Sequence, residues 1–271
     1  MNKTIGFIGT GNMGTAMIKG IVAAGLVPPK NIFVHDVNTD KLKALQDELG
    51  VSPLETNEAL VEKSDVVLLA VKPNMVKSVL EGCRDQFTAN KILISIAVGL
   101  PLKLYRGILG PDVKIIRAMP NTPALVGEGM TIISFEKDVT EQEEKLVISI
   151  LECTGRVEVL EERLMNEVTA VTGSSPAYVF MFIEAMADAA VQSGIPRALA
   201  YKLASQAVLG SAKMVLETGR HPGELKDQVC SPGGTTIEAV RTLEKHGFRF
   251  AVMDAMNECT EKAREIGKIY G

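Results

Sequence analysis

The sequence feature that most constrains the fold is a glycine-rich turn between a short apolar run and an amphipathic segment. Gly9-Thr10-Gly11-Asn12-Met13-Gly14 has the spacing GxGxxG, and the preceding run Thr4–Ile8 predicts a β-strand. In a strand–turn–helix unit the first glycine permits the tight turn and the second lets the backbone approach a pyrophosphate. The third lets helix and strand lie close together. The motif therefore predicts a parallel sheet with a phosphate-binding loop before its first helix.

An acidic residue after the next predicted strand strengthens this interpretation. The run Ile32–His35 is followed by Asp36, 22 residues after Gly14, and the acid that binds the ribose of a dinucleotide lies about 20 residues on. A glycine-rich turn without a ligand is the alternative, but strand, glycine spacing, helix and acid agree on a dinucleotide. Asp36 favours NADH because a carboxylate repels a 2′-phosphate, whereas Asn38 and two nearby lysines would help to bind one. The sequence leaves NADPH and NADH open.

Short apolar runs alternate with amphipathic segments up to about residue 162. Several runs are apolar throughout, which is typical of strands covered by helices on both faces. The first half is therefore expected to be a doubly wound α/β domain. Further strands are predicted at Val66–Val71, Lys91–Ala97, Lys114–Arg117, Met130–Ser134 and Val157–Leu160, and helices at Thr15–Ala24, Asp40–Leu49, Asn74–Cys83 and after the capping box that starts at Thr140.

The strand signal ends near residue 162, and the rest of the chain is predicted to be all-helical. One of its helices, around Ala177–Gln192, is apolar nearly all round, which is typical of a buried helix. We therefore expect a dinucleotide-binding domain at 1–162, a helical domain at 163–271, and association of subunits. The predicted helices are Glu162–Thr172, Pro176–Ser193, Arg197–Thr218, Thr235–His246 and Phe248–Ile266.

Bulk properties exclude several functional classes. The net charge of -4 argues against a protein that coats nucleic acid. No apolar run approaches the ~20 residues of a membrane span, and the first residues pass directly into a strand pattern without the apolar stretch of a signal peptide. The four cysteines are scattered, so we expect reduced thiols and no metal site. A cytoplasmic protein without nucleic-acid or membrane partners is predicted.

The most informative segment of the second half is Ser231-Pro232-Gly233-Gly234-Thr235-Thr236. Ser231 suits an N-cap and Pro232 the first helical position, and the glycines leave backbone N–H groups accessible to a small anion such as a carboxylate. A capped helix without a ligand is an equal alternative. Two glycines in a first turn cost helix stability, which favours a binding function.

Two other loops follow predicted strands, at Ala70-Val71-Lys72-Pro73 and Arg117–Ala124. In open α/β sheets, ligands bind beyond the carboxyl ends of the strands. The three histidines, His35, His221 and His246, are expected in surface or capping roles, and no HExxH motif or acidic metal cluster is present. A mechanism that needs no strong protein base is therefore favoured.

Together these segments closely resemble the pyrroline-5-carboxylate reductases. The match runs through essentially the whole chain, and its most specific part is Ser231–Thr236 with Ile237. The resemblance implies a Rossmann domain, a helical dimerisation domain interlocked with its partner's, and often a ring of five dimers. It implies an oxidoreductase that uses NADPH or NADH to reduce a cyclic imine carboxylate, 1-pyrroline-5-carboxylate, to L-proline in the last step of proline biosynthesis.

The resemblance also assigns residues by position. Those expected at the cofactor are Ile8, Gly9, Thr10, Gly11, Asn12, Met13 and Gly14 at the pyrophosphate loop, Asp36, Asn38 and Asn57 near the ribose, and Ala70, Val71, Lys72, Pro73 and Val98 along the cleft. Those expected at the substrate are Ser231, Gly233, Gly234, Thr235, Thr236 and Glu162. Of these, Thr236, near the ring nitrogen, and Ser231 are the expected catalytic residues, with no metal.

Three rival functions differ in recognisable features. A β-hydroxyacid dehydrogenase would need a lysine on the helix after a glycine-rich turn, and Gly173–Asp188 contains no Lys or Arg. A non-catalytic NAD(P)-sensing protein would have a degraded carboxylate site, whereas Ser231–Thr236 looks intact. A related imine reductase acting on a six-membered ring stays open, because residue identities do not fix ring size.

Overall fold

The structure is a computed structural model that describes residues 3–136 and 138–270. Two compact units are present: unit 1 comprises the residues up to Ser174 and those from Cys259 onward, and unit 2 comprises Ser175–Glu258. This division differs from the boundary predicted at 162/163. Residues 163–174 and the end of the last helix belong to unit 1, where the Arg264 guanidinium pairs with the Glu167 carboxylate at 2.7 Å.

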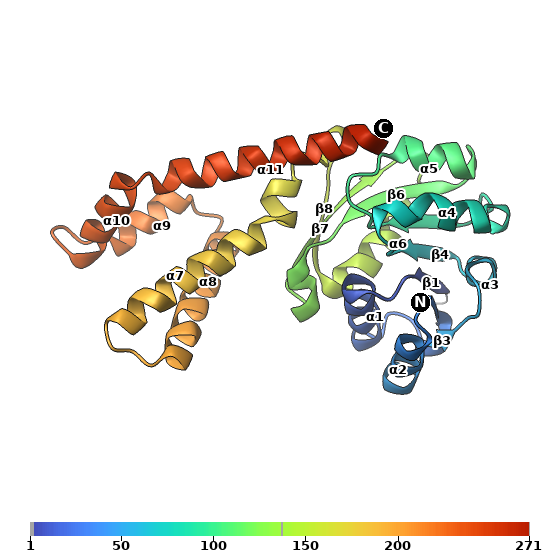
Figure 1. Cartoon of the computed structure of the whole chain (residues 1–271), viewed down its shortest axis with the longest axis horizontal. Coiled ribbons are helices and arrows are strands. Elements are labelled where there is room, and N and C mark those ends of the chain that lie inside the picture. Colours follow the sequence, from blue (N-terminus) through green and yellow to red (C-terminus); the bar gives the residue numbers. More distant parts are fainter. Residues whose placement is uncertain (1–2, 137, 271) are drawn as a thin grey trace. The chain divides into compact units, whose positions relative to one another are not determined.

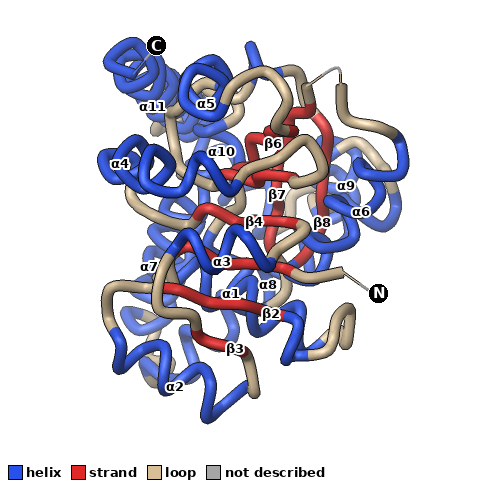
Figure 2. Tube along the Cα trace, turned by 90° about the vertical axis from the view of Figure 1, so that its right-hand side faces the viewer, coloured by secondary structure: helices blue, strands red, loops and turns tan. Residues whose placement is uncertain are grey.

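Unit 1 is built on an eight-stranded sheet with the order β3-β2-β1-β4-β5-β6-β7-β8 (Figure 2). The strand order reverses between β1 and β4, which is where open α/β sheets bind ligands. The strands are β1 Ile5–Ile8, β2 Ile32–His35, β3 Ser52–Pro53, β4 Val66–Leu69, β5 Ile92–Ser95, β6 Lys114–Met119, β7 Gly129–Phe135 and β8 Gly155–Val159.

Helices cover both faces of this sheet (Figure 1). Successive residues of a strand point to opposite faces, so Val66 and Leu68 of β4 enter one core while Val67 and Leu69 enter the other. This confirms the doubly wound fold and explains the continuous apolar runs. One face carries α1 Asn12–Ala23, α2 Thr39–Leu49 and α6 Glu141–Leu151, and the other carries α3 Asn57–Lys63, α4 Pro73–Cys83 and α5 Leu102–Leu109.

Two strands, β7 and β8, run opposite to the other six, because β7 is antiparallel to β6 and parallel to β8. β7 pairs antiparallel with β6, with Ala118 opposite Ile133. The connection between them holds only the short 3-10 turn Thr122–Val126, and a parallel crossover needs about a dozen residues, usually a helix. The sequence analysis also did not predict β3, α3 and α5.

The helix predicted at Glu162–Thr172 is wrong as one continuous α-helix. The segment forms a 3-10 turn at Glu162–Leu164 and a π-helical turn at Thr169–Gly173. The Thr169 and Thr172 hydroxyls donate to the carbonyls of Met165 and Val168, four residues back, at 3.2 and 3.4 Å. Such local side-chain bonds compete with regular helical hydrogen bonding.

Unit 2 is helical, as predicted, although the helix at Pro222–Val229 was not predicted. It contains α7 Ser175–Gln192, α8 Arg197–Thr218, α9 Pro222–Val229, α10 Thr235–Lys245 and the first part of α11 Phe248–Tyr270. α7 and α8 run side by side as a hairpin (Figure 1), and the Phe182 and Phe248 rings lie 6.1 Å apart. Among the described residues, no helix combines the length and apolar character needed to cross a membrane.

The prediction that α7 is buried is wrong for the single chain. Phe180 and Met181 are 62% and 69% exposed, and Ala187 is the one buried residue of the helix. An apolar surface of this extent marks an interaction site. The expected burial therefore needs a partner.

Candidate active site

The glycine-rich loop has the geometry that its spacing predicts. Gly9 has φ +97°, and a Cβ there would lie 2.7 Å from the Ala70 carbonyl oxygen. A Cβ on Gly14 would lie 2.5 Å from the Gly9 carbonyl oxygen. Gly11, at the N-cap of α1, makes no side-chain capping bond and has open space where its Cβ would be. The backbone N–H groups at the start of α1 therefore face an open cradle that suits a phosphate.

A pocket of about 240 Å³ lies beside this loop at the carboxyl ends of β1, β2 and β4. The Asn57 Oδ1 atom, on its wall, is buried and has no hydrogen-bond partner among the described residues. A buried polar atom normally has a partner, so this one fits a donor from a bound ligand. The lining residues are Ile8, Gly9, Gly11, His35, Asp36, Val37, Asn57, Ala70, Val71, Lys72, Met75 and Val79.

The Asp36 carboxylate is held by the loop itself. Its Oδ2 atom accepts from the backbone N–H and the hydroxyl of Thr10 at 2.7 and 3.0 Å, and its Oδ1 atom accepts from the Asn38 N–H at 2.9 Å. Partial burial works to raise the pKa of Asp36, but these bonds and the charge of Lys41 outweigh it and hold the pKa below its ordinary value. The carboxylate is therefore ionised at neutral pH.

The remaining residues expected at the cofactor lie at helix starts, with the exception of Val98. Asn12, Met13 and Gly14 open α1, and Pro73 is the first residue of α4. Asn38 caps α2 by accepting from the Lys41 N–H at 3.2 Å. Val98 is 52% exposed and lines a different pocket of unit 1, of about 270 Å³, with Asn166 and Cys259 among its neighbours.

Four lining residues of the pocket beside the glycine-rich loop were not predicted: His35, Val37, Met75 and Val79. Met75 and Val79 are four residues apart on α4, so they share one helix face. That spacing was a signal available in the sequence. The His35 ring also bonds the Leu54 carbonyl through Nδ1 at 2.9 Å.

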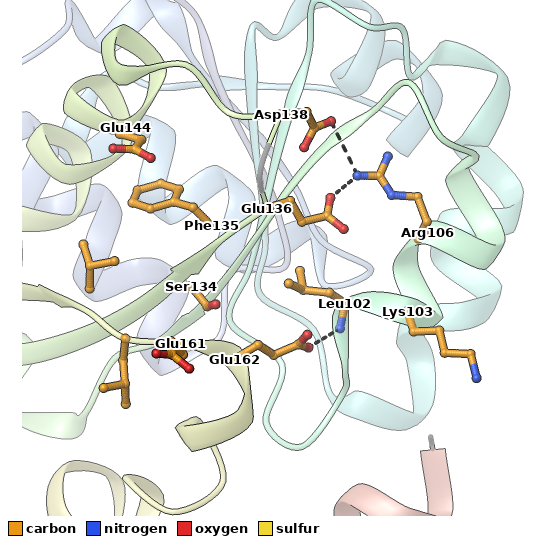
Figure 3. A pocket seen from close by; sticks show the side chains of 12 residues that line it. Leu102, Lys103, Arg106, Ser134, Phe135, Glu136, Asp138, Glu144, Glu161 and Glu162 are labelled. Carbon is orange, nitrogen blue, oxygen red and sulfur yellow. Dashed lines mark hydrogen bonds and ion pairs between the residues drawn. The ribbon is translucent and has the colours of Figure 1, made fainter.

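Glu162, expected at the substrate, has two partners within unit 1. Its Oε1 atom accepts from the Leu102 N–H at 2.6 Å, at the start of α5 (Figure 3), and lies 3.8 Å from the Arg117 Nη1 atom. Burial lowers the pKa of Arg117, while the neighbouring Glu162 and Tyr105 act to raise it. Arg117 also donates to the Asn166 Oδ1 atom at 2.9 Å. In this structure Glu162 caps a helix and balances a buried cation.

The loop expected to bind the substrate carboxylate lies in unit 2. The prediction that Ser231 is the N-cap is wrong: α10 begins at Thr235, with Gly234 as the N-cap and no side-chain capping bond. The reason is Gly233, whose φ of +67° turns the chain, while the Gly234 N–H donates to the Ser231 carbonyl at 3.0 Å. The start of α10 thus has uncapped N–H groups beside the exposed Ser231 and Thr235 and the half-buried Thr236.

The described residues contain no cluster of three or more His, Cys, Asp or Glu side chains suited to a metal ion. The four cysteines are free thiols. His221 caps α9 by accepting from the Gly223 N–H at 3.1 Å, which confirms its predicted capping role. Unit 1 therefore offers backbone N–H groups, an amide and one carboxylate, and unit 2 offers backbone N–H groups and hydroxyls. A doubly wound sheet with such a loop, joined to a helical unit with its own uncapped helix start, defines a dinucleotide-dependent oxidoreductase of two units.

Comparison with known proteins supports the assignment to a dinucleotide-dependent oxidoreductase. The family model described as pyrroline-5-carboxylate reductase dimerisation matches residues 162–266, and that of NADP oxidoreductase, coenzyme F420-dependent, matches residues 4–99. The pyrroline-5-carboxylate reductase of Escherichia coli (strain K12) is 52% identical over 99% of this chain and 100% of that protein. That of Methanosarcina acetivorans is 45% identical over 98% and 99%.

Solved structures show the same relation. A pyrroline-5-carboxylate reductase from Coxiella burnetii superposes with a TM-score of 0.92 at 36% identity, covering 98% of this chain and 99% of that one. A pyrroline carboxylate reductase from Plasmodium falciparum, with NADP bound, gives 0.88 at 35% identity, covering 98% of both chains. This chain belongs to the pyrroline-5-carboxylate reductase family, and it is an NAD(P)H-dependent oxidoreductase that forms homo-oligomers.

Proposed function

We propose that this chain reduces 1-pyrroline-5-carboxylate to L-proline, with NADPH or NADH as hydride donor. The observation that carries the proposal is the uncapped start of α10 beside the hydroxyls of Ser231, Thr235 and Thr236. Helix starts of this kind bind small anions, and the proposed substrate is a small ring with a carboxylate. The full-length relatives are named pyrroline-5-carboxylate reductases, which supports the choice of a five-membered ring.

The residues at the glycine-rich loop fit the cofactor. The open space at Gly11 leaves the N–H groups of Asn12 and Met13 free to hold the pyrophosphate, and the unpartnered Asn57 Oδ1 atom suits a donor from the adenosine half. Asp36, Asn38, Ala70–Pro73 and Val98 complete the proposed set. When bound, the reduced nicotinamide supplies the hydride.

The chain's own part in the reaction is to bind and align the substrate. Backbone N–H groups at Thr235 and Thr236, the first residues of α10, hold the carboxylate together with the Ser231 hydroxyl, and the Thr236 hydroxyl orients the ring nitrogen. When that nitrogen is protonated, the imine carbon is electrophilic and accepts the hydride directly, giving the secondary amine with no covalent bond to the protein. Proximity and orientation therefore provide most of the catalysis. Glu162 stays a proposed substrate contact, and its bonds to Leu102 and Arg117 would fix the position of its carboxylate.

We further propose a homodimer in which the apolar surface of unit 2 is covered by a second copy, and five such dimers as the larger assembly. The exposed Phe180 and Met181 support the dimer. The two functional domains are proposed to meet near residue 162, where the match to the dimerisation model begins. A cytoplasmic location, without nucleic-acid or membrane partners, suits a biosynthetic enzyme of this kind.

The proposal is tested by the oxidation of NADPH and NADH with DL-pyrroline-5-carboxylate. The wild type is expected to turn over with at least one donor, and Thr236→Ala to lower kcat/KM about 100-fold, the usual loss for one donor at a reacting group. Dinucleotide affinity should stay within about twofold, because Thr236 lies in unit 2. Thr242→Ala, on the same helix with its hydroxyl bonded to the Glu238 carbonyl, is the matched control. Wild-type protein that binds dinucleotide but oxidises neither donor would refute the substrate assignment.

A further inference from the structure

Three of the lone pairs on the Asp36 carboxylate are used by the chain itself. Oδ2 takes both the N–H and the hydroxyl of Thr10, and Oδ1 takes the Asn38 N–H. A carboxylate offers about four acceptor positions. One position, on Oδ1, is left for a ligand.

An adenosine ribose with two free hydroxyls can donate more hydrogen bonds than the one remaining position on Asp36 can accept. In NADH the 2′- and 3′-hydroxyls are neighbours, and an acid at the end of the second strand accepts from the ribose. Two hydroxyl donors need two acceptor positions, whereas Asp36 has one. NADPH replaces the 2′-hydroxyl with a phosphate, which a carboxylate repels. The next residue, Val37, is 86% exposed and carries no charge to attract that phosphate.

We propose that the Thr10 hydroxyl sets how strongly this chain distinguishes NADH from NADPH, by holding one Asp36 oxygen on the glycine-rich loop. Thr10 is then a positioning residue that acts through Asp36, and it makes the preference for NADH weaker than a free aspartate would impose. The inference rests on the proposed dinucleotide-binding function. It concerns the side chain of Thr10, whereas the pyrophosphate role of the loop belongs to its backbone.

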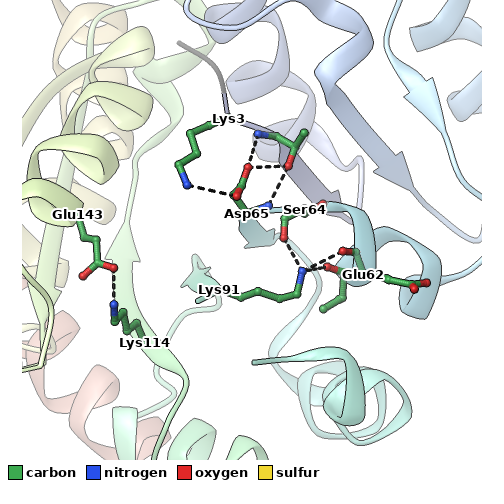
Figure 4. A network of polar contacts seen from close by, with 9 residues as sticks. Lys3, Glu62, Ser64, Asp65, Lys91, Lys114 and Glu143 are labelled. Atoms are coloured by element: carbon green, nitrogen blue, oxygen red, sulfur yellow. Dashed lines mark hydrogen bonds and ion pairs between the residues drawn. The ribbon is translucent and has the colours of Figure 1, made fainter. Parts of the chain in front are cut away.

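The chain contains a matched control for this pair. The Oδ2 atom of Asp65 (Figure 4) accepts from the N–H and the hydroxyl of Thr4 at 2.8 and 2.9 Å. The same two bonds join Thr10 to the Oδ2 atom of Asp36. Thr4 lies before β1 and Thr10 after it, so the two pairs stand at opposite ends of the same strand. Only one of them borders the dinucleotide pocket. Thr4→Val therefore removes the same kind of bond away from the ligand.

The test measures dissociation constants for NADH and NADPH, in parallel, by nicotinamide fluorescence with the full-length chain and no imine. Thr10→Val frees one acceptor on Asp36, so NADH should bind about fivefold more tightly, the effect of one added hydrogen bond. NADPH should bind no more tightly than to the wild type. Thr10→Ser, which keeps the hydroxyl, and Thr4→Val should retain the wild-type ratio of the two constants.

Two further measurements keep the outcomes distinct. In an Asp36→Asn background, Thr10→Val should leave the ratio unchanged, because its effect passes through the carboxylate. If Thr10→Val fails to fold, Thr10→Ala is measured in its place. An unchanged ratio in the folded Thr10 variant, or an equal change in Thr4→Val, would overturn the inference while leaving the dinucleotide site intact. A wild-type chain that binds neither dinucleotide would overturn the proposed function, and this inference with it.

Discussion

Gly9 and Gly11 stand two residues apart in one loop and are glycine for different reasons. Gly9 has φ +97°, and a Cβ added there would collide with the backbone carbonyl group of Ala70. Gly11 has φ -64° and open space around its Cβ position. Gly9→Ala should therefore lower the free energy of unfolding by about 2–3 kcal/mol, the cost of a strained backbone site, as measured by urea denaturation.

Gly11→Ala is expected to leave the stability unchanged and to weaken dinucleotide binding. The new Cβ enters the cradle without straining the backbone, so the free energy of unfolding should stay within about 0.5 kcal/mol of the wild type. Dinucleotide affinity should fall at least about tenfold, because the pyrophosphate can no longer approach the loop. Equal loss of stability in both variants, or normal binding by Gly11→Ala, would contradict this division of roles.

Motif spacing predicted the tight turn between β1 and α1 correctly, because Gly9 and Gly14 each meet a local requirement of the backbone. The same local logic misplaced the start of α10: Ser231 has the side chain of an N-cap, but Gly233 at φ +67° turns the chain first. The engagement of Asp36 by Thr10 was out of reach as well. It joins residues 26 apart, and the residue types alone do not say which partner a carboxylate takes.

At the scale of elements, a polar network joins the amino ends of β1 and β4, two central strands of the sheet (Figure 4). Asp65 accepts from Thr4 and pairs with Lys3 at 3.2 Å. Partial burial acts to raise the pKa of Asp65, but the bonds from Thr4 and the charge of Lys3 hold it below its ordinary value. The network therefore stabilises the fold only while Asp65 is ionised.

This gives a pH dependence with a definite sign. A folded-state pKa below the unfolded value of about 3.9 means that the stabilisation is fully present above that value and is lost as pH falls through the folded pKa. The difference in unfolding free energy between wild type and Asp65→Asn should be greatest near neutral pH and shrink below about pH 4. Urea titrations from pH 7 to pH 3 measure it, with Asp112→Asn, at an exposed site, controlling for the charge change. A difference that does not vary with pH would exclude this role for Asp65.

Long periodic or fully apolar elements were predictable, and those completed by distant contacts were not. Arg197–Thr218 was predicted with its observed bounds, and the capping box at Thr140 is present. In contrast, the first N–H of α5, at Leu102, is satisfied by Glu162, 60 residues away. A helix of eight residues with such a cap gives no local start signal.

For the whole molecule, position along the chain does not decide which unit a segment packs in. The C-terminal part of α11 belongs to unit 1, where Arg264 pairs with Glu167. The sequence analysis placed this segment in the helical domain because helical periodicity does not reveal which core a helix joins. The apolar character of α7, by contrast, suggested association of subunits, which the match to a dimerisation domain supports.

That partner is testable through charge. A Glu side chain at position 181 would be buried without a counter-ion if a second copy covers α7, and an unpaired buried charge costs several kcal/mol. Met181→Glu should therefore shift the solution mass toward that of one chain, 29.1 kDa, in light scattering at micromolar concentration. NADH affinity should be retained, because the dinucleotide pocket is formed by unit 1 alone.

Lys77→Glu, on the exposed surface of α4 in unit 1, makes the net charge more negative than Met181→Glu does, without touching unit 2, and should keep the wild-type mass. If Met181→Glu also keeps that mass, α7 lies outside the subunit interface, since several kcal/mol would change a dissociation constant by about a thousandfold or more. If both variants dissociate, net charge and not apolar burial governs assembly. Dissociation of Met181→Glu alone, with NADH affinity intact, would assign the subunit interface to unit 2 and dinucleotide binding to unit 1.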